Sequence, residues 1–247
     1  MTAADPLLRE VAARALPLLD LTDLSEGCTE EPVRLLCERA QRYAVAAVCV
    51  WPRFVAEAAQ ALTGGGVRIA TVVNFPDGGE DVAGTLAETR TAIEDGADEI
   101  DLVLPYRALL RGEADTARAM VAAVREACGE TRLKVILETG MLPDADTVAR
   151  ASRLALEAGA DFLKTSTGKT PVSATPEAAE AMLLAIREGG GRIGLKVSGG
   201  LRRVEDAARY LALADRIMGP DWVNAETFRI GASSLLDDLV RAAEAGA

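Results

Sequence analysis

The chain has 247 residues, of which 49% are hydrophobic and 26% charged, and it carries a formal net charge of −11. This length suits one α/β barrel or one large doubly wound domain and is too short for two ordinary enzyme domains. The excess of 38 acidic over 27 basic side chains argues against nucleic acid and anionic membrane surfaces as partners. No apolar run reaches the roughly 18 residues that span a bilayer. The first residues, MTAADPLLRE, lack a secretory signal, so we expect a cytoplasmic protein.

Eight short runs rich in β-branched and apolar residues recur along the chain, with helical patterns between them. Most of these runs are apolar on both faces at their centre, which is typical of strands in a buried parallel sheet. The predicted strands are 17–24, 46–52, 68–75, 99–105, 133–139, 161–168, 194–200 and 228–234.

The segments between the strands have the periodicity of amphipathic helices. Apolar residues recur at spacings of three and four in 85–97 and 144–160. A third helix is predicted over 175–190, where Thr175 can cap the helix and Pro176 can occupy its first position. Glycines stand where these helices should end, at Gly96, Gly159 and Gly189.

The unbroken succession of eight strand–helix units predicts a closed (β/α)8 barrel. No linker, close repeat or low-complexity tract interrupts it, so we expect a single domain over 1–247. The alternative is a doubly wound open sheet, which usually has a glycine-rich turn after its first strand. Here that region reads LDLTDLSEGC and has no such turn. In a barrel, the active site lies at the C-terminal ends of the strands.

The residue types that are missing or scarce narrow the chemistry. The chain has no histidine, which excludes Ser-His-Asp and Cys-His catalysis and histidine-based metal sites. No two of the four cysteines form a C-x-x-C pair, which argues against a zinc ribbon or a dithiol redox site. Among 27 basic residues only four are lysines, and only lysine can supply a neutral amine. These lysines are Lys134, Lys164, Lys169 and Lys196.

Two of the lysines are predicted to be neighbours. Side-chain alternation places Lys164 on one face of the sixth strand and Lys196 on one face of the seventh. If both face inward, they lie about 5 Å apart across the sheet, and their mutual repulsion lowers the pKa of one amine. A neutral lysine amine attacks carbonyls and forms a Schiff base. The alternative is that both lysines form ordinary salt bridges with buried carboxylates.

Proton transfer requires a second group, and without histidine a carboxylate or another lysine must provide it. Asp101 lies within the apolar strand EIDLVLP, where an unpartnered acid is costly. Lys134 on the next strand could pair with it. A structural Asp101–Lys134 pair and a catalytic Asp101 are compatible interpretations.

Anion binding is predicted at the ends of the last strands. The seventh strand is followed by SGGLR at 198–202 and the eighth ends in GASS at 231–234, while STGK at 166–169 adds Lys169. Glycines let backbone N–H groups approach an anion, and the loops after strands seven and eight are the usual phosphate site of such barrels. The alternative is that these glycines only permit tight turns.

Seven motifs in order resemble the deoxyribose-phosphate aldolase family, over nearly the whole chain. They are VCVWPRF, TVVNFPDG, GADEIDLVLPYRAL, LKVILETG, DFLKTSTGK, LKVSGGLR and RIGASSLL. The resemblance implies a class I aldolase that reversibly cleaves 2-deoxy-D-ribose 5-phosphate to D-glyceraldehyde 3-phosphate and acetaldehyde, in deoxyribonucleotide catabolism. It implies no metal and no cofactor, and such barrels are often homodimers.

The resemblance also implies a role for each matching residue. Lys164 would form the Schiff base, Lys196 would tune it and share in proton transfer, and Asp101 would donate and accept protons. Lys134, which we group with the residues expected to bind the substrate, would support Asp101. Residues implied to contact the substrate's hydroxyl groups are Asp20, Thr22 and Cys49. Those implied to contact its phosphate are Thr167, Gly168, Lys169, Gly199, Gly200, Ser233 and Ser234.

Two other functions remain open from the sequence. Another Schiff-base barrel enzyme, such as a transaldolase-like or keto-acid aldolase, would share Lys164 but use a different donor. A barrel that only binds a phosphorylated ligand would have the anion site without the reaction.

Overall fold

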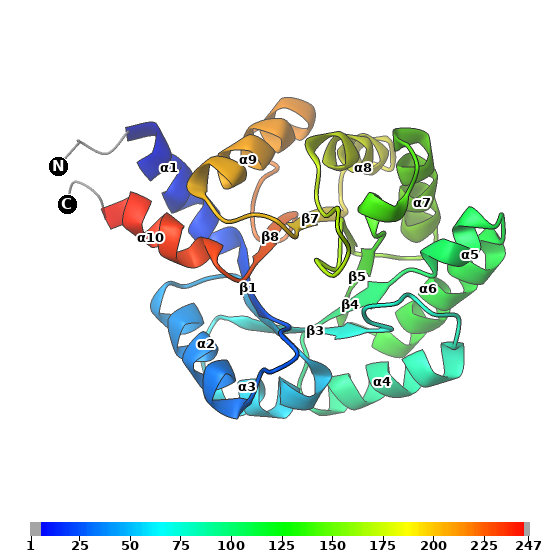
Figure 1. Ribbon diagram of the computed structural model, residues 1–247, viewed down its shortest axis with the longest axis horizontal. Helices are drawn as coiled ribbons and strands as arrows, with labels where there is room; N and C mark the ends of the chain where they lie inside the picture. Colours follow the sequence, from blue (N-terminus) through cyan, green and yellow to red (C-terminus); the bar gives the residue numbers. More distant parts are fainter. Residues whose placement is uncertain (1–5, 245–247) are drawn as a thin grey trace.

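Eight parallel strands, each paired with its neighbours in chain order, close into a barrel. The computed structural model describes residues 6–244. Figure 1 shows the strands at the centre with the helices around them. The strands are β1 (Leu19–Asp23), β2 (Ala47–Val50), β3 (Arg68–Val73), β4 (Glu99–Val103), β5 (Arg132–Ile136), β6 (Phe162–Lys164), β7 (Gly194–Ser198) and β8 (Phe228–Ala232). The predicted (β/α)8 barrel is therefore confirmed.

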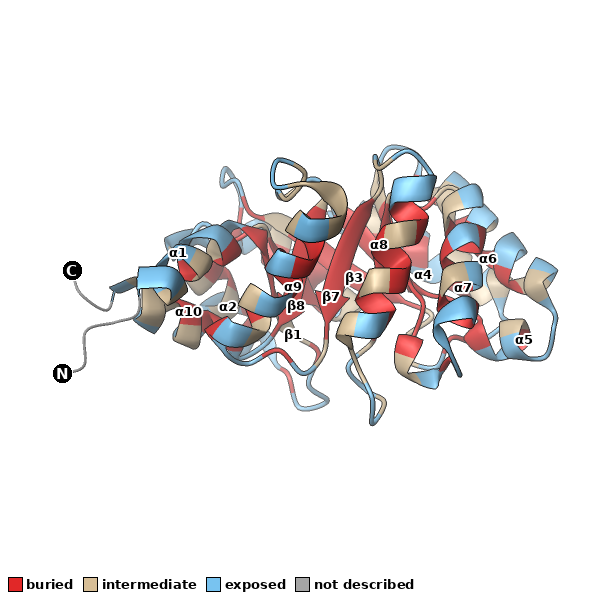
Figure 2. Cartoon of the chain, turned by 90° about the horizontal axis from the view of Figure 1, so that it is seen from above, coloured by how far each residue is buried: buried red, intermediate tan, exposed pale blue. Residues whose placement is uncertain are grey.

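The strands pair with one another on the inside and pack against helices on the outside. Figure 2 shows their buried residues surrounded by helices whose outer faces are exposed. The first helix, which precedes β1, lies beside the last (Figure 1). The helices are α1 (Pro6–Ala15), α2 (Glu30–Arg42), α3 (Val55–Ala61), α4 (Val82–Glu94), α5 (Tyr106–Leu110), α6 (Ala114–Cys128), α7 (Ala145–Glu157), α8 (Pro176–Glu188), α9 (Val204–Met218) and α10 (Leu235–Glu244). Three short 3-10 helices are Leu16–Leu18, Pro52–Phe54 and Thr139–Met141.

All three predicted helices are present, with their beginnings set by capping side chains. The Thr175 hydroxyl accepts the Ala178 N–H at 3.2 Å, and Pro176 opens α8 as expected. The helix predicted from 85 instead begins at Val82, because the Asp81 carboxylate accepts the Gly84 N–H at 3.0 Å. A side-chain cap satisfies backbone donors that have no partner within the helix.

Seven of the eight strands end two to four residues before the predicted C-terminal boundary, and β1 ends one residue before it. The largest difference is at β6, predicted to reach Gly168 and observed to end at Lys164. Beyond that point the backbone turns, and Gly168 has a φ of +78°, which belongs to the left-handed region and not to a strand. Of the residues that follow the observed end of β6, Thr167 and Gly168 line the cavity at the barrel mouth.

No helix among residues 6–244 is long and apolar enough to cross a membrane. The expectation that MTAADPLLRE carries no secretory signal falls in part on residues 1–5, which lie outside the described residues.

Candidate active site

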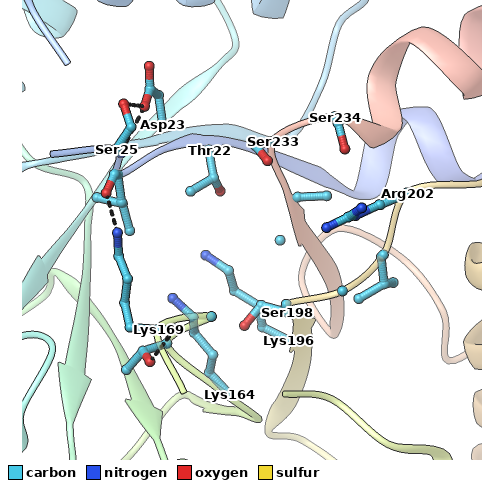
Figure 3. A pocket seen from close by; sticks show the side chains of 18 residues that line it. Thr22, Asp23, Ser25, Lys164, Lys169, Lys196, Ser198, Arg202, Ser233 and Ser234 are labelled. Carbon is cyan, nitrogen blue, oxygen red and sulfur yellow. Dashed lines mark hydrogen bonds between the residues drawn. The ribbon is translucent and has the colours of Figure 1, made fainter. Parts of the chain in front are cut away.

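The two lysines predicted to be neighbours lie side by side on the inner wall of the barrel. Lys164 is the last residue of β6 and is in register with Lys196 of β7. Their side chains are 4% and 1% exposed. Figure 3 shows both ammonium groups pointing toward the cavity at the barrel mouth. The expected juxtaposition of two inward-facing lysines is therefore present.

The carboxylate of Asp101, on β4, links these lysines to a third one. Its Oδ2 atom accepts hydrogen bonds from Lys164 Nζ at 2.7 Å and Lys196 Nζ at 2.8 Å. Its Oδ1 atom accepts one from Lys134 Nζ at 2.7 Å. The predicted Asp101–Lys134 pair is thus present, and so are the salt bridges of the other two lysines that the sequence left as an alternative. The same contacts give protons a direct route between the groups.

The electrostatics of the site distinguish the two central lysines. Burial lowers the pKa of Lys164, Asp101 opposes this effect, and the Lys196 ammonium lowers the pKa further. Burial also acts to lower the pKa of Lys196, but Asp101 and Asp20 outweigh it and raise that pKa well above its ordinary value. Lys164 is therefore the amine that is more easily neutralised. The expected repulsion from Lys196 contributes, but burial is the larger cause.

Asp101 is held as a carboxylate. Burial acts to raise its pKa, but the ammonium groups of Lys134, Lys164 and Lys196 outweigh burial and hold the pKa well below its usual range. Asp101 therefore stays ionised and can accept hydrogen bonds from all three lysines.

Three residues expected to contact the substrate lie beneath the cavity. Asp20, Cys49 and Lys134 are fully buried and are not among the residues that line it. The Asp20 Oδ2 atom lies 2.6 Å from Lys196 Nζ. The Cys49 thiol keeps its proton, because burial raises its pKa. Asp20 and Lys134 therefore contact the charged groups beneath the cavity, Lys196 and Asp101, and Cys49 is a neutral neighbour.

The cavity at the barrel mouth has a volume of about 320 Å³, with Lys164 and Lys196 at its base. Its walls come from the loops that follow β1, β6, β7 and β8. The implied substrate-binding residues that line it are Thr22, Thr167, Gly168, Lys169, Gly199, Gly200, Ser233 and Ser234. Figure 3 shows Ser233 and Ser234 across the cavity from Lys169.

The turn after β7 has a backbone that only glycine adopts without strain. Gly199 and Gly200 have φ values of +88° and +86°. A Cβ atom on Gly199 would lie 2.5 Å from the Ser173 side chain, so there is no room for a larger residue. These glycines do form a tight turn, and the turn lies at the cavity, where backbone N–H groups can approach an anion.

The structure adds residues to the site that sequence reasoning missed. Arg202 lines the cavity as an exposed cation. Glu138 fixes the loop after β6: its carboxylate accepts hydrogen bonds from the Thr167 hydroxyl at 2.5 Å and the Thr170 hydroxyl at 3.2 Å. The cation of Lys169 is engaged, since its Nζ atom donates to the Leu24 carbonyl at 2.7 Å.

Two more charged residues, Glu99 and Arg229, are fully buried in the barrel interior. The sequence feature that could have identified Glu99 is its position two residues before Asp101, because this spacing places both side chains on the same face of β4. The feature that could have identified Arg229 is its charge within the otherwise uncharged predicted strand FRIGASS.

A buried, easily neutralised amine at the base of a polar cavity in a (β/α)8 barrel defines an enzyme that acts on carbonyl compounds through a lysine. The model of the DeoC/LacD family aldolases matches residues 15–240. The chain belongs to this aldolase family, and it is therefore an enzyme of the carbon–carbon lyase class. A barrel that only binds a ligand is excluded.

Individual relatives agree with this assignment. The chain is 53% identical over 242 residues to the deoxyribose-phosphate aldolase of Agrobacterium fabrum, covering 96% of this chain and 93% of the relative. The solved deoxyribose phosphate aldolase of Aeropyrum pernix, which is tetrameric, superposes with a TM-score of 0.78 at 28% identity, covering 95% of this chain and 91% of that one. QR15, an aldolase, gives a TM-score of 0.80 at 27% identity, covering 92% and 95%.

Proposed function

We propose that this aldolase reversibly cleaves 2-deoxy-D-ribose 5-phosphate to D-glyceraldehyde 3-phosphate and acetaldehyde, as the name of its Agrobacterium fabrum relative suggests. The observation that carries the proposal is the position of Lys164. Its amine lies at the base of the cavity, 2.7 Å from the Asp101 carboxylate, while the turns after β7 and β8 lie at the mouth. A sugar phosphate with its phosphate at these turns has its carbonyl end toward the lysine.

The reaction begins with attack of the neutral Lys164 amine on the aldehyde carbon of the sugar. Water leaves, and the resulting iminium withdraws electrons from the neighbouring carbon–carbon bond. The C3 hydroxyl loses its proton, the C2–C3 bond breaks, and D-glyceraldehyde 3-phosphate departs. Protonation of the remaining enamine at C2 and hydrolysis of the imine release acetaldehyde and restore the amine.

Asp101 and Lys196 are proposed to move the protons in these steps. Their side chains are 2.8 Å apart, and both face the Lys164 amine, so a proton can pass between them and, through a water, the substrate. Lys134 holds the other oxygen of Asp101 and keeps the carboxylate in place. No metal or cofactor is required by this scheme.

The phosphate is proposed to bind at Gly199, Gly200, Ser233 and Ser234, beside Thr167, Gly168 and Lys169 of the loop after β6. Exposed Arg202 adds a positive charge at the same rim. A cation, hydroxyl groups and a glycine turn together favour a dianion on a protein whose net charge is −11. Thr22, with Asp20 and Cys49 beneath it, is proposed to face the sugar hydroxyl groups.

Reductive trapping tests the proposal. Acetaldehyde and borohydride should add one C2H4 unit to Lys164, identified by peptide mass spectrometry, and Lys164→Arg provides the control with the charge retained. Modification of another lysine in place of Lys164, or the absence of any modified lysine, would contradict the proposal. Product analysis then separates this reaction from that of another Schiff-base aldolase: if 2-deoxy-D-ribose 5-phosphate releases no acetaldehyde, the substrate assignment is wrong.

We also propose a single-domain, cytoplasmic homodimer. The four cysteines, Cys28, Cys37, Cys49 and Cys128, are all free and buried, as expected for a reducing compartment. Light scattering after gel filtration tests the assembly, since a dimer has twice the 25.9 kDa mass of the chain.

A further inference from the structure

Six charged side chains inside the barrel form a closed ring of ion pairs. They come from five strands that surround the interior, so the ring crosses the barrel and does not follow one wall. In order around the ring they are Arg229, Asp20, Lys196, Asp101, Lys134 and Glu99.

One half of the ring runs from β8 to β4. Arg229 Nη1 lies 2.7 Å from Asp20 Oδ1, and Asp20 Oδ2 lies 2.6 Å from Lys196 Nζ. Lys196 Nζ in turn lies 2.8 Å from Asp101 Oδ2. Asp20 and Asp101 each connect two consecutive cations of the ring through their two carboxylate oxygens.

The other half returns to β8. Asp101 Oδ1 lies 2.7 Å from Lys134 Nζ, and the same ammonium lies 2.6 Å from Glu99 Oε2. Glu99 Oε1 then lies 2.9 Å from Arg229 Nη2 and closes the ring. Glu99 and Arg229 stand on opposite strands, β4 and β8, so their contact spans the interior.

The ring contains three cations and three anions, so its net charge is zero. Lys164 is a seventh charged group, and its only ion pair among the described residues is with Asp101, at 2.7 Å. When Lys164 is protonated, the buried cluster carries one uncompensated positive charge. Because such a charge is costly away from water, the surplus proton leaves from Lys164.

The other charges around the ring are closer to solvent. Arg132 Nη1 and Arg68 Nη1 contact the Glu99 carboxylate at 2.9 and 3.3 Å from the end of the barrel remote from the mouth. Their side chains are 19% and 38% exposed, and both also pair with exposed Glu226. Water and salt screen them more than the ring members. Beside Lys164, the remaining titratable group is the Cys49 thiol, which is neutral.

We propose that Glu99 and Arg229 are positioning residues for the aldol reaction: they close a neutral ring that makes Lys164 the one cation in excess. Neither lines the cavity. They act through the two lysines that hold Asp101, because Arg229 orients Asp20 against Lys196 and Glu99 orients Lys134. The inference rests on the proposed Schiff base at Lys164.

Opposite single substitutions test the charge count. Arg229→Met leaves the ring with one net negative charge, which stabilises protonated Lys164. Glu99→Gln leaves one net positive charge, which destabilises it. The measurement is the pH at which borohydride trapping of acetaldehyde on Lys164 is half-maximal. It should rise in Arg229→Met and fall in Glu99→Gln, each by roughly one pH unit, as one charge several ångströms away produces at an effective dielectric constant of about 20.

The double variant separates charge from folding. Glu99→Gln combined with Arg229→Met removes one anion and one cation, so the pH of half-maximal trapping should return to within a few tenths of the wild-type value. A merely structural role would make the double variant at least as impaired as either single one. Arg229→Lys keeps the charge and should also keep the wild-type midpoint, even if the rate falls.

Arg132→Gln is the matched control, because this arginine contacts the same Glu99 carboxylate from outside the ring. Its midpoint should move much less than that of Arg229→Met. Circular dichroism establishes that each variant is folded, and if one single variant does not fold, the shift of the other single variant and its reversal in the double variant still test the count. A folded single variant with the wild-type midpoint, or a shifted double variant, would overturn the inference. Absence of trapping in the wild type would instead overturn the proposed function.

Discussion

The mouth of the barrel and its interior are built in different ways. At the mouth, glycine turns, serine hydroxyls and an exposed arginine line a cavity of about 320 Å³. In the interior, long charged side chains from neighbouring and opposite strands contact one another at 2.6 to 2.9 Å with almost no exposure to water. The mouth is assembled from local loop geometry, whereas the interior depends on strands far apart in the chain.

This difference separates binding from chemistry. We expect a substitution at the mouth to remove a contact to the substrate and to leave the reacting amine unchanged. A substitution in the interior alters the charge that Lys164 experiences, because a buried charge is poorly screened. We therefore expect mouth variants to change KM and interior variants to change kcat and its pH dependence.

The largest effect is expected from Lys164→Arg. Arginine does not deprotonate in a protein, so it cannot form a Schiff base. Turnover should fall by at least roughly 10⁴-fold, the scale of losing a nucleophile, while circular dichroism shows an intact barrel. Retained turnover with a folded protein would place the nucleophile elsewhere.

Lys196→Leu should be the next most severe. Its ammonium helps to lower the pKa of Lys164, so its loss raises that pKa and reduces the neutral fraction at pH 7. We expect kcat to fall by about 10²–10³-fold, with the rising limb of the pH–rate profile moved to higher pH. A profile that keeps its midpoint would show that the two lysines are not coupled.

Asp101→Asn should separate proton transfer from imine formation. The amide keeps the size of the side chain but cannot accept a proton, so we expect kcat to fall by about 10²-fold. Borohydride trapping of acetaldehyde on Lys164 should persist. If trapping disappears while the protein stays folded, Asp101 acts before the imine forms.

The smallest effect is expected at the mouth, from Ser233→Ala combined with Ser234→Ala. Both hydroxyl groups are exposed, where a hydrogen bond contributes roughly 0.5–1.5 kcal/mol, so loss of both should raise KM for the phosphorylated sugar about tenfold or more with kcat nearly unchanged. KM for unphosphorylated 2-deoxy-D-ribose is the control and should not change. A rise for both sugars would show that these serines do not recognise the phosphate.

Much of the barrel and part of the site could be predicted because they follow local rules. The two-residue alternation of strands placed Lys164 and Lys196 inward, and their strands are consecutive, so their pairing needed no knowledge of the rest of the fold. The beginning of α8 was predicted from Thr175 as a capping residue, and the structure confirms it. The strand ends were not predicted well, since β-branched Thr165 and Thr167 continue past the end of β6 at Lys164 up to the bend at Gly168.

Periodicity and the pairing of consecutive strands are enough to predict the eight-unit barrel, the inward-facing lysines and the glycine and serine turns at the mouth. No such local rule predicts that Glu99 and Arg229, 130 positions apart, join Asp20 and Lys134 in one ring. That ring exists because the barrel closes, which brings β4 and β8 face to face across an interior that water does not reach.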